Sequence, residues 1–459
     1  MRIEMPEKVK LIIETLQAQG FEAYAVGGCV RDAMLGRVPH DWDVTTSALP
    51  YQVKELFRRT IDTGIVHGTV TVMLDKEGFE VTTYRVDGEY EDGRHPKEVS
   101  FTASLSEDLR RRDFTINAMA YNDTEGLVDL FDGAGDLQNK VIRCVGEAKE
   151  RFSEDALRIL RAFRFSAQLD FSIAEDTLLA AKELAQNLRK ISAERIFAEL
   201  SKLLVSEHPE RLLAAYRTGV TKVILPEFDR MMETPQNHPA HRENVGMHCL
   251  STTDFVTGVS EFAPEGGFSE NDFRVLRLAA VFHDVGKPAC RETDADGIDH
   301  FKGHAQVGAT EVKKILQRLK TDNYTMDTVT RLVQYHDYPF LAEEKAVRRA
   351  MNKIGPELFP MLFVLRTADL LAHNEPYASE GPERMRKTWE CFRRIREKGE
   401  CTSLKELAVS GSDLIAAGFL PGKQLGDLLQ NLLEVVLEDP EKNDRQTLLS
   451  YAGEHYGKK

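Results

Sequence analysis

The sequence predicts an α+β protein in which a head of mixed strands and helices is followed by all-α regions. Residues 1–140 alternate segments with the hydrophobic periodicity of helices and of strands, whereas most of the chain beyond residue 149 has helical periodicity. Aromatic residues make up only 8% of the chain, which argues against a β-sandwich. We expect four parts: a head over 1–140, a helical neck over 141–230, a helical middle region over 231–378 and a helical C-terminal region over 379–459.

The elements of the head follow from periodicity and turn residues. Lys8–Gln19 has a helical pattern that stops at Gly20. Four segments have the pattern of short strands, namely Ala23–Val26, Asp43–Thr45, Thr69–Leu74 and Glu80–Arg85. The stretch Glu227–Glu243, rich in Pro, Met and Asn, predicts a linker before the middle region.

The composition indicates a globular protein of a reducing compartment. Hydrophobic residues make up 42% of the chain and charged residues 29%. The six cysteines include no C-x-x-C pair, which argues against a disulfide framework. No segment has the pattern of a signal peptide or a membrane span, so we expect a cytoplasmic protein with no membrane partner. Nothing in the pattern indicates an oligomeric state.

The charge of the chain limits the nucleic acids that it can bind. A formal net charge of −14 argues against a protein that coats long nucleic acids without selectivity, because phosphate binding needs Lys and Arg. Basic residues are nevertheless clustered at 110–112, 158–164, 348–349 and 384–396. Such local clusters are compatible with binding one small RNA by its end.

The most specific local pattern is a glycine pair followed by two aspartates. Asp41 and Asp43, two residues apart on an expected strand, point to the same face of a sheet. This arrangement suits two divalent ions roughly 3.5–4 Å apart, one activating an attacking hydroxyl and one on a triphosphate. Upstream, Gly27 and Gly28 allow backbone N–H groups to approach phosphates, and Arg31 adds a charged donor. A D-x-D or a Gly-Gly alone is more often a turn; their combination favours a nucleotidyltransferase.

A third carboxylate usually completes a site of this kind. Glu80 is our candidate, because it lies between Phe79 and Val81 on a probable neighbouring strand. An ordinary outward-facing residue of the strand is an equally good interpretation of Glu80 alone.

Five motifs now carry a resemblance to a known family, the class II tRNA nucleotidyltransferases and bacterial poly(A) polymerases. Gly27–Asp43 resembles the first motif of their polymerase-β-like head, and Arg111–Ala118 is similar to the ribose-selecting motif. The sequence Asp129-Leu130-Phe131, with Gly133 and Asp136-Leu137, resembles a flexible hinge. Glu154–Arg158 resembles the base-selecting motif and Ser192–Ile196 a helical brace. The order of the five motifs over about 200 residues is highly specific. The resemblance implies a two-ion mechanism with Mg²⁺ at Asp41 and Asp43.

The spacing of the base-selecting motif suggests how a base is chosen without a template. Asp155, Arg158, Arg161 and Arg164 recur every three residues and would form one row on a helix. A solvated polar face is the commoner meaning of such a row, but the row holds one Asp and three Arg with no Lys or Glu. A carboxylate and a guanidinium can together present a Watson–Crick-like edge to C or A.

The resemblance gives these residues more specific roles. It implies base selection by Asp155 and Arg158, with Arg161 and Arg164 near the phosphates. In the ribose motif, Asp113 and Asn117 could bond a 2′-hydroxyl and favour NTP over dNTP, and Arg112 is placed to meet the triphosphate. The two neighbouring arginines, Arg110 and Arg111, are equally well explained as surface residues.

The middle region carries a second group of potential metal ligands. His283-Asp284-Val285-Gly286-Lys287 resembles the signature of HD-type phosphohydrolases. The resemblance implies a ligand set of His248, His283, Asp284, His304, His336 and Asp369. Mixed imidazole and carboxylate ligands favour a divalent transition metal such as Mn, Fe or Ni over Ca. We expect metal binding here, and a phosphohydrolase activity is an even alternative to an inactive site.

The C-terminal region resembles the segment that supports tRNA in the same family. The residues that carry the resemblance are Gly411–Gly418, Pro421–Gly426 and Asn443–Arg445, which predict capped helices joined by turns. Without the family, the modest basic content would indicate only a structural helical module.

Four functions remain open at this stage. The first is a CCA-adding enzyme that binds the 3′ end of tRNA and uses CTP and ATP. The second is a poly(A) polymerase, which the acidic composition disfavours, and the third adds only CC or only A. Against the third stands the polar segment Asp87–Glu107, which has the length found in full CCA enzymes. The fourth is a phosphohydrolase whose head only binds RNA, which the intact Asp41 and Asp43 disfavour.

Overall fold

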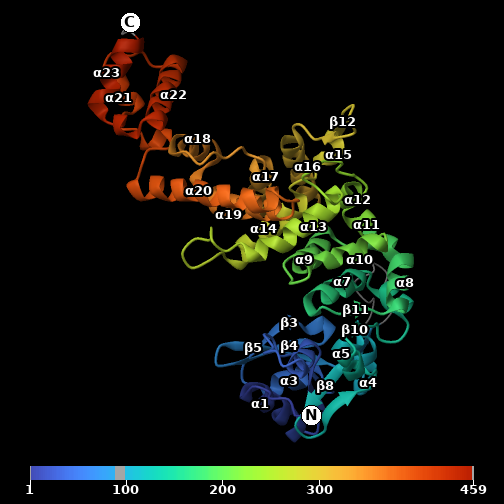
Figure 1. Cartoon of the computed structure of the whole chain (residues 1–459). Helices are drawn as coiled ribbons and strands as arrows, with labels where there is room; N and C mark the ends of the chain where they lie inside the picture. Colours follow the sequence, from blue (N-terminus) through green and yellow to red (C-terminus); the bar gives the residue numbers. More distant parts are fainter. Residues whose placement is uncertain (1, 88–98, 457–459) are drawn as a thin grey trace. The chain divides into compact units, whose positions relative to one another are not determined.

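The computed structural model describes residues 2–87 and 99–456. The chain forms two compact units, Met1–Asp229 and Arg230–Lys459, which are described separately below. Figure 1 follows the chain from the blue head to the red C-terminal helices. The boundary between the units lies close to the expected end of the neck, and the finer division into four parts stays a prediction. The mixed sheet of the head and the helices after it confirm the expected α+β fold class.

A seven-stranded sheet forms the head, in the order β3-β4-β5-β2-β1-β8-β9. In this sheet β2 and β5 run parallel and the other neighbouring pairs run antiparallel. The strands are β1 (Ala23–Val26), β2 (Val44–Thr46), β3 (Thr60–Gly64), β4 (Thr69–Leu74), β5 (Glu77–Thr83), β8 (Met119–Asn122) and β9 (Gly126–Asp129). The short pairs are β6 (Arg85–Asp87) with β7 (Val99–Phe101), and β10 (Val141–Ile142) with β11 (Ser172–Ile173).

The expected strands agree with this sheet, but β2 and β5 differ from the expected ranges at both ends. The bounds of β1 and β4 are those predicted, but β2 begins at Val44, so the two aspartates of the D-x-D pattern precede it. Strand β5 begins three residues earlier than expected, because Asp75 and Lys76 adopt φ of 49° and 72° and close a tight hairpin with β4. Sequence periodicity does not identify this turn, since neither residue is Gly or Asn.

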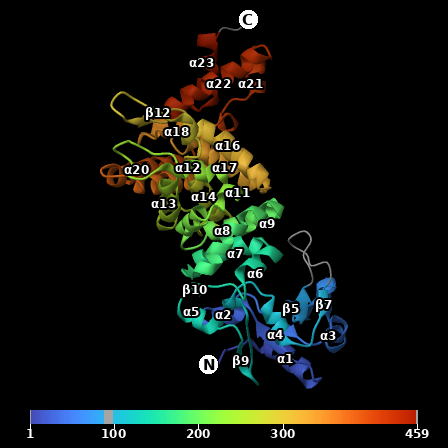
Figure 2. The ribbon, with the colours of Figure 1, turned by 90° about the vertical axis from the view of Figure 1, so that its right-hand side faces the viewer.

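Helices cover the sheet of the head and then form the neck. The apolar face of α1 (Glu7–Ala18) buries Val9, Ile12 and Leu16 and contacts β1. The other head helices are α2 (Gly28–Met34), α3 (Pro50–Leu56), α4 (Leu105–Arg110) and α5 (Gly133–Gln138). The neck contains α6 (Ala148–Glu154), α7 (Leu157–Leu169), α8 (Glu175–Leu184), α9 (Ala193–Leu204), α10 (Leu212–Arg217) and α11 (Thr221–Ile224). Figure 2 shows α7 and α9 (green) side by side, and the two helices are in contact.

The expected linker after the neck is partly wrong. Its first residues form α12 (Pro226–Met232), because Phe228 and Met231 are fully buried and hold this segment against the rest of the chain. Beyond it, residues 235–237 lie outside helices and strands. The run of Pro, Met and Asn therefore predicted the extended part correctly but missed a helix stabilised by tertiary contacts.

Helices make up most of the second unit. Its first part contains α13 (Val245–Phe255), α14 (Glu270–Phe282), α15 (Lys287–Cys290), the strands β12 (Glu292–Thr293) and β13 (Asp299–His300), α16 (His304–Arg318), α17 (Asn323–Tyr335), α18 (Glu344–Ile354), α19 (Phe359–Leu371) and α20 (Tyr377–Lys398). An aromatic core, in which Phe363 contacts Phe262, Phe359 and Trp389, packs α19 against α20. The potential metal ligands lie on or directly after α13, α14, α16, α17 and α19. Of these helices, α14 contacts α13, α17 and α19, and α16 contacts α17.

The C-terminal helices have a small core of their own. These helices are α21 (Gly411–Ala416), α22 (Lys423–Glu438) and α23 (Arg445–Tyr456), and they bury Leu432, Val436 and Leu448. The buried Arg348 of α18 donates to the carbonyl of Leu437 and to the carboxylate of Glu400, so it joins α18 to α22. One of the basic clusters seen in the sequence thus serves an internal contact.

Two expectations from composition can be compared with the structure. All six cysteines are free, as expected. None of the helices in residues 2–87 and 99–456 combines the length and apolar character needed to cross a bilayer. The polar segment Asp87–Glu107 falls largely on residues 88–98, which lie outside the described residues.

Candidate functional site

Three exposed carboxylates lie close together where β2 begins beside β5. Asp41 and Asp43 are exposed and flank the buried Trp42 just before β2, and Asp41 lies close enough to repel the Asp43 carboxylate. The parallel pairing of Val44 with Val81 places Glu80 beside Asp43 in the register. Glu80 is exposed between buried neighbours on β5. The register therefore brings together the three residues that we predicted as catalytic.

The close approach of these carboxylates affects their protonation. Protein atoms around the Asp43 carboxylate reduce its hydration, and Glu80 and then Asp41 repel its negative charge, so its pKa is raised. Arg112 opposes this shift. Mutual repulsion among three carboxylates is the electrostatic condition that a divalent cation relieves. The residues present thus fit a magnesium site, with Asp41 and Asp43 as ligands.

The glycine turn lies directly beside these carboxylates. Gly27 has a φ of 86°, a conformation that residues with a side chain rarely adopt, and Gly28 begins α2. A Cβ atom at Gly27 would come within 2.9 Å of Nη1 of Arg112. The absence of a side chain at position 27 therefore lets the Arg112 guanidinium approach the backbone of the turn.

A chain of hydrogen bonds joins the glycine turn to the neck. Arg31 donates to Oδ1 of Asn117 at 2.7 Å, and Nδ2 of Asn117 donates to Oδ1 of Asp113 at 3.0 Å. Nε of Arg161 donates to Oδ2 of Asp113 at 2.7 Å. Burial raises the pKa of Asp113, but Arg161 and Asn117 more than offset this effect and hold the pKa below its ordinary value. Asp113 is thus an anion that fixes two of the other predicted nucleotide ligands.

Arg164 has a more buried position than the resemblance implies. Its Nε donates to Glu199 at 2.5 Å and its Nη1 to Gln168 at 2.8 Å. The ring of Phe165 lies under three guanidinium groups, at 5.0 Å from Arg31, 5.3 Å from Arg161 and 3.9 Å from Arg164. The contacts of Arg164 in the present structure are those of a packing residue.

Asp155 and Arg158 lie where the neck meets the head. Arg158 is on α7, whereas Asp155 precedes this helix. Asp155 has an extended conformation between α6 and α7, and its Oδ1 accepts from the N–H of Leu157, so the expected row of four begins outside the helix. This difference has a physical reason, because an Asp side chain readily caps the free N–H groups at a helix start. Its Oδ2 accepts from Arg195 at 2.8 Å.

The contacts of Arg158 reach both the helix before it and the head. Arg158 donates to Glu154 at 2.6 Å and to the backbone carbonyl of Arg111 at 2.8 Å. Arg111 belongs to the segment that resembles the ribose-selecting motif, so Arg158, which we predicted to select the base, is anchored on the segment that carries Arg112 and Asp113. All predicted nucleotide ligands of the head and neck therefore lie in one connected region of the first unit.

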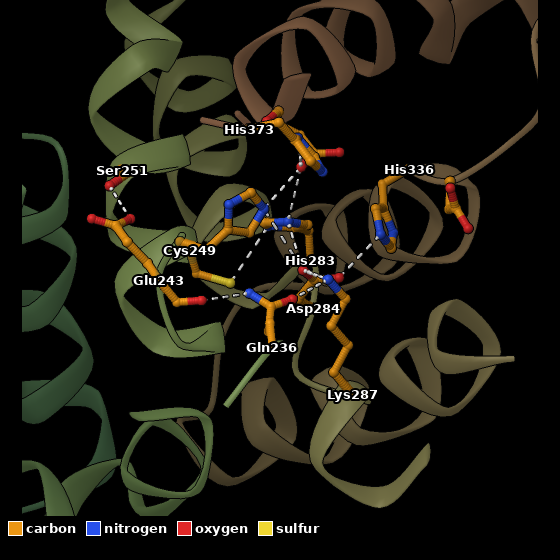
Figure 3. A network of polar contacts seen from close by, with 12 residues as sticks. Gln236, Glu243, Cys249, Ser251, His283, Asp284, Lys287, His336 and His373 are labelled. Atoms are coloured by element: carbon orange, nitrogen blue, oxygen red, sulfur yellow. Dashed lines mark hydrogen bonds and ion pairs between the residues drawn. The ribbon is translucent and has the colours of Figure 1, made fainter. Parts of the chain in front are cut away.

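The second unit brings its six predicted ligands together around Asp284. Figure 3 shows three of them, His283, Asp284 and His336. Oδ2 of Asp284 lies 3.3 Å from Nε2 of His283 and 3.8 Å from Nε2 of His248. Oδ1 lies 3.3 Å from Nε2 of His304 and 3.5 Å from Nε2 of His336. Asp369 completes the first side at 3.0 Å from His248. The two oxygens of Asp284 thus face two separate groups of ligands, which is the arrangement of a shared carboxylate between two ions.

Three imidazoles of the cluster share one orientation. Nδ1 of His283, of His304 and of His336 lies 2.8 Å from a backbone carbonyl, which leaves each Nε2 aimed at the carboxylates. Nε2 of His283 is buried and makes no hydrogen bond. A buried nitrogen without a partner is costly, and a cation would satisfy it. These observations fit a metal ion at this position.

A cavity of about 490 Å³ gives access to this cluster. Its lining includes His241 and His373, whose rings pack against His248 and against each other. Burial is the main cause that lowers the pKa of His241 to about 2, and the positive charge of Lys287 acts in the same direction. This imidazole is therefore neutral. The cavity has the size of a small-molecule site.

Several contributing residues were absent from the predicted set. Lys287 contacts Asp284 at 2.7 Å and Arg366 contacts Asp369 at 2.7 Å. In each case the cation lies three residues from the carboxylate, within α19 for Arg366 and across the turn before α15 for Lys287, a spacing that could have identified it. Arg195, quoted only within the brace motif, anchors Asp155, and no local sequence signal reveals that contact over 40 positions.

Similarity to protein families defines the class of this protein. A family described as "Poly A polymerase head domain" matches residues 23–143, and "Probable RNA and SrmB- binding site of polymerase A" matches residues 170–232. A third, "tRNA nucleotidyltransferase domain 2 putative", matches residues 301–452. The chain is therefore a nucleotidyltransferase with a polymerase-β-like head. These matches do not include His248, His283 or Asp284.

Full-length relatives then give the family. The CCA-adding enzyme of Lactiplantibacillus plantarum is 52% identical over 97% of this chain and 95% of its own. That of Enterococcus faecalis is 35% identical over 96% of this chain and 94% of its own. The crystal structure of the Bacillus stearothermophilus CCA-adding enzyme in complex with CTP has a TM-score of 0.71 and 28% identity, with 98% of both chains covered. The chain belongs to the family of CCA-adding enzymes.

The carboxylate face yields a prediction about metal and activity. We expect Asp43→Asn to lower nucleotide addition by about a thousandfold, because it removes a charged ligand at the reacting centre. The same change should abolish the rise in Tm that Mg²⁺ causes at neutral pH, without lowering Tm in the absence of Mg²⁺, since it relieves repulsion from Glu80 and Asp41. Thermal unfolding with and without Mg²⁺, together with single-nucleotide addition, measures both effects.

The raised pKa of Asp43 gives this prediction a pH dependence. A raised carboxyl pKa means that repulsion costs stability above that pKa and is relieved as the pH falls through it. The Mg²⁺-induced shift in Tm of the wild-type protein should therefore shrink on acidification, because protons compete with the cation. A shift that persists in Asp43→Asn would place the cation elsewhere.

The position of Asp155 yields a prediction about base choice. Asp155→Ala should admit U or G, with a loss of discrimination of about 1–3 kcal/mol, as for one bidentate base contact. Addition of each of the four nucleotides to a tRNA lacking CCA measures it. Asp170→Ala is the matched control, because Asp170 is also a neck carboxylate held by an arginine but lies on the far end of α7. Equal slowing of all four nucleotides by Asp155→Ala would show that this residue is only structural.

Proposed function

We propose that this protein builds and repairs the 3′-terminal CCA of tRNA, adding C from CTP and A from ATP without a nucleic-acid template. Membership of the family over almost the whole chain is the observation that carries this proposal. The carboxylate face of the head and the Asp155–Arg158 region of the neck support it, because they lie in the same unit and are linked through Arg111.

The residues of the head have separate tasks in this reaction. Asp41 and Asp43, with Glu80 beside them, would hold two Mg²⁺ ions, which when bound activate the tRNA hydroxyl and neutralise charge on the triphosphate. The turn at Gly27 and Gly28 admits phosphate oxygens to the backbone. Arg112 lies against this turn and supplies positive charge to the triphosphate.

Ribose and base are bound at the junction of head and neck. Asp113 accepts hydrogen bonds from Asn117, Arg161 and the N–H of Phe114, and a carboxylate has about four lone-pair sites, so one remains for a 2′-hydroxyl. Asp155 accepts from the exocyclic amino group that C and A share, and Arg158 donates to their ring acceptors. G and U lack this pattern on the matching edge, which excludes them without a template.

The alternatives raised by the sequence have weaker support. The full-length relatives carry the name of CCA-adding enzymes, which disfavours a poly(A) polymerase and a phosphohydrolase with an RNA-binding head. Addition of only CC or only A differs from full CCA addition in its product alone.

Product lengths test the proposed reaction. We expect tRNA transcripts that lack CCA to gain three nucleotides with CTP and ATP together and to stop after CC with CTP alone. Transcripts ending in CC should gain one A, and transcripts ending in CCA should gain nothing. Denaturing gels with each labelled NTP resolve these products. Long A tails would identify a poly(A) polymerase, and a stop at CC with both nucleotides present would identify a partial enzyme.

A second activity is supported by the ligand set of the middle region. We infer that the Asp284 cluster binds a divalent transition metal, Mn, Fe or Ni, and releases phosphate from a phosphorylated substrate. The oriented imidazoles, the shared carboxylate and the adjacent cavity support this proposal. Burial lowers the pKa of His248 and favours its neutral form, which is the form that binds metal.

This second activity should be separable from CCA addition. The double change His283→Ala with Asp284→Ala should remove one or two metal ions per chain and abolish metal-dependent phosphate release. CCA addition should stay within about threefold of wild type, because the two sites lie in different compact units and coupling between such sites is modest. Elemental analysis, phosphate release and CCA addition are measured on the same preparations.

His300→Ala is the control for this experiment, because His300 is an exposed imidazole of the same cavity that contributes no ligand. Wild-type protein that retains no transition metal after purification with Mn²⁺ or Ni²⁺ would make the middle region a scaffold. Loss of CCA addition in a folded double variant would show that the two sites are not independent.

A further inference from the structure

Asp108 of α4 is a fully buried carboxylate that belongs to none of the motifs above. Its side chain has no exposed surface. It lies in the head, three and four residues before the two arginines that open the ribose-selecting motif. A charge in such a position is stable only when other charges or hydrogen bonds compensate it.

Three side chains compensate the charge of Asp108. Arg111 donates to Oδ1 through Nε at 3.0 Å and through Nη2 at 2.7 Å. Oδ2 accepts from Thr45 at 3.1 Å and lies 3.5 Å from Nη2 of Arg112. Burial raises the pKa of Asp108, but Arg111 and Arg112 outweigh this effect and lower it, so the carboxylate is ionised. Asp108 is thus an anion between two cations and a hydroxyl.

These partners connect Asp108 with three parts of the nucleotide site. Thr45 is on β2, two residues after Asp43, so Asp108 is tied to the strand that follows the catalytic carboxylates. Arg112 extends from Asp108 to the turn at Gly27. The carbonyl of Arg111 accepts the hydrogen bond of Arg158.

We propose that Asp108 is a positioning residue for nucleotidyl transfer: it holds Arg112 at the phosphate-binding turn and Arg111 where its carbonyl anchors Arg158. The proposal rests on the proposed CCA addition. Asp108 touches neither nucleotide nor metal and acts only through these two arginines. Because both CTP and ATP use the same turn and the same Arg158, the effect is common to the two nucleotides.

A buried carboxylate of the second unit provides a matched control. Asp299 is 1% exposed, accepts from Thr293 at 2.6 Å and pairs with Arg291 at 3.1 Å. It resembles Asp108 in burial and in having one hydroxyl and one arginine partner, but it belongs to the other compact unit, and neither partner is among the predicted nucleotide ligands. Asp299→Asn therefore measures what the loss of a buried, paired charge does to the fold alone.

The test compares steady-state kinetics of Asp108→Asn and Asp299→Asn in the full-length protein. CTP is varied with tRNA lacking CCA, and ATP with tRNA ending in CC. We expect Asp108→Asn to raise the KM of both nucleotides about tenfold, the effect of one charge-assisted hydrogen bond, with a smaller change in kcat. Asp299→Asn should leave both KM values within about twofold of wild type, even where Tm falls.

A second variant keeps the proposal testable if Asp108→Asn does not fold. Thr45→Val removes one donor to Asp108 without changing the charge, and it should raise both KM values in the same direction by a smaller factor. Unchanged KM values in folded Asp108→Asn or in Thr45→Val, with activity lost only in proportion to the unfolded fraction, would overturn the proposal. Wild-type protein that adds no CCA would instead refute the proposed function, so the two failures are distinguishable.

Discussion

Arginines of the first unit are held by buried or half-buried carboxylates, and the arrangement of the nucleotide site depends on this pairing. Asp113 holds Arg161, Glu199 holds Arg164, and Asp108 holds Arg111. Removing one partner from such a pair leaves an uncompensated charge, which typically costs about 3–5 kcal/mol. The carboxylates therefore fix the guanidinium groups in one arrangement. A site that adds two different bases without a template needs such fixed donors, because no complementary strand supplies the geometry.

The parts of this arrangement that depend on local pattern could be predicted from the sequence. Short β-prone runs bounded by turn residues placed β1 and β4 at their observed bounds, and the D-x-D spacing predicted that Asp41 and Asp43 act together, although both precede β2. The family resemblance predicted the ligand set around Asp284, which the fold brings together. Glu80 was one of two equal interpretations, and only the pairing of β2 with β5 places it beside Asp43.

The parts that depend on partners distant in the chain could not be predicted. Thr45 and Asp108 are 63 positions apart, and Arg195 reaches Asp155 over 40 positions. Basic clusters were also ambiguous, because a guanidinium that binds phosphate and one that binds a carboxylate look the same in a sequence. Arg348, in one of those clusters, joins α18 to α22 through Glu400 and the Leu437 carbonyl. Asp155 lies outside its expected helix because capping competes with helical continuation.

The ring of Phe165 also holds arginines of the nucleotide site, but it does so without a charge. Its ring attracts three guanidinium groups through the negative face of the aromatic system and carries no net charge. When a phosphate arrives, a carboxylate partner competes with it for the same donors, but an aromatic face does not. The contacts with Phe165 can therefore persist in the free and the nucleotide-bound enzyme. This ring supports the guanidinium groups throughout the catalytic cycle. A phosphate can therefore replace a carboxylate as their partner with little movement of the arginines.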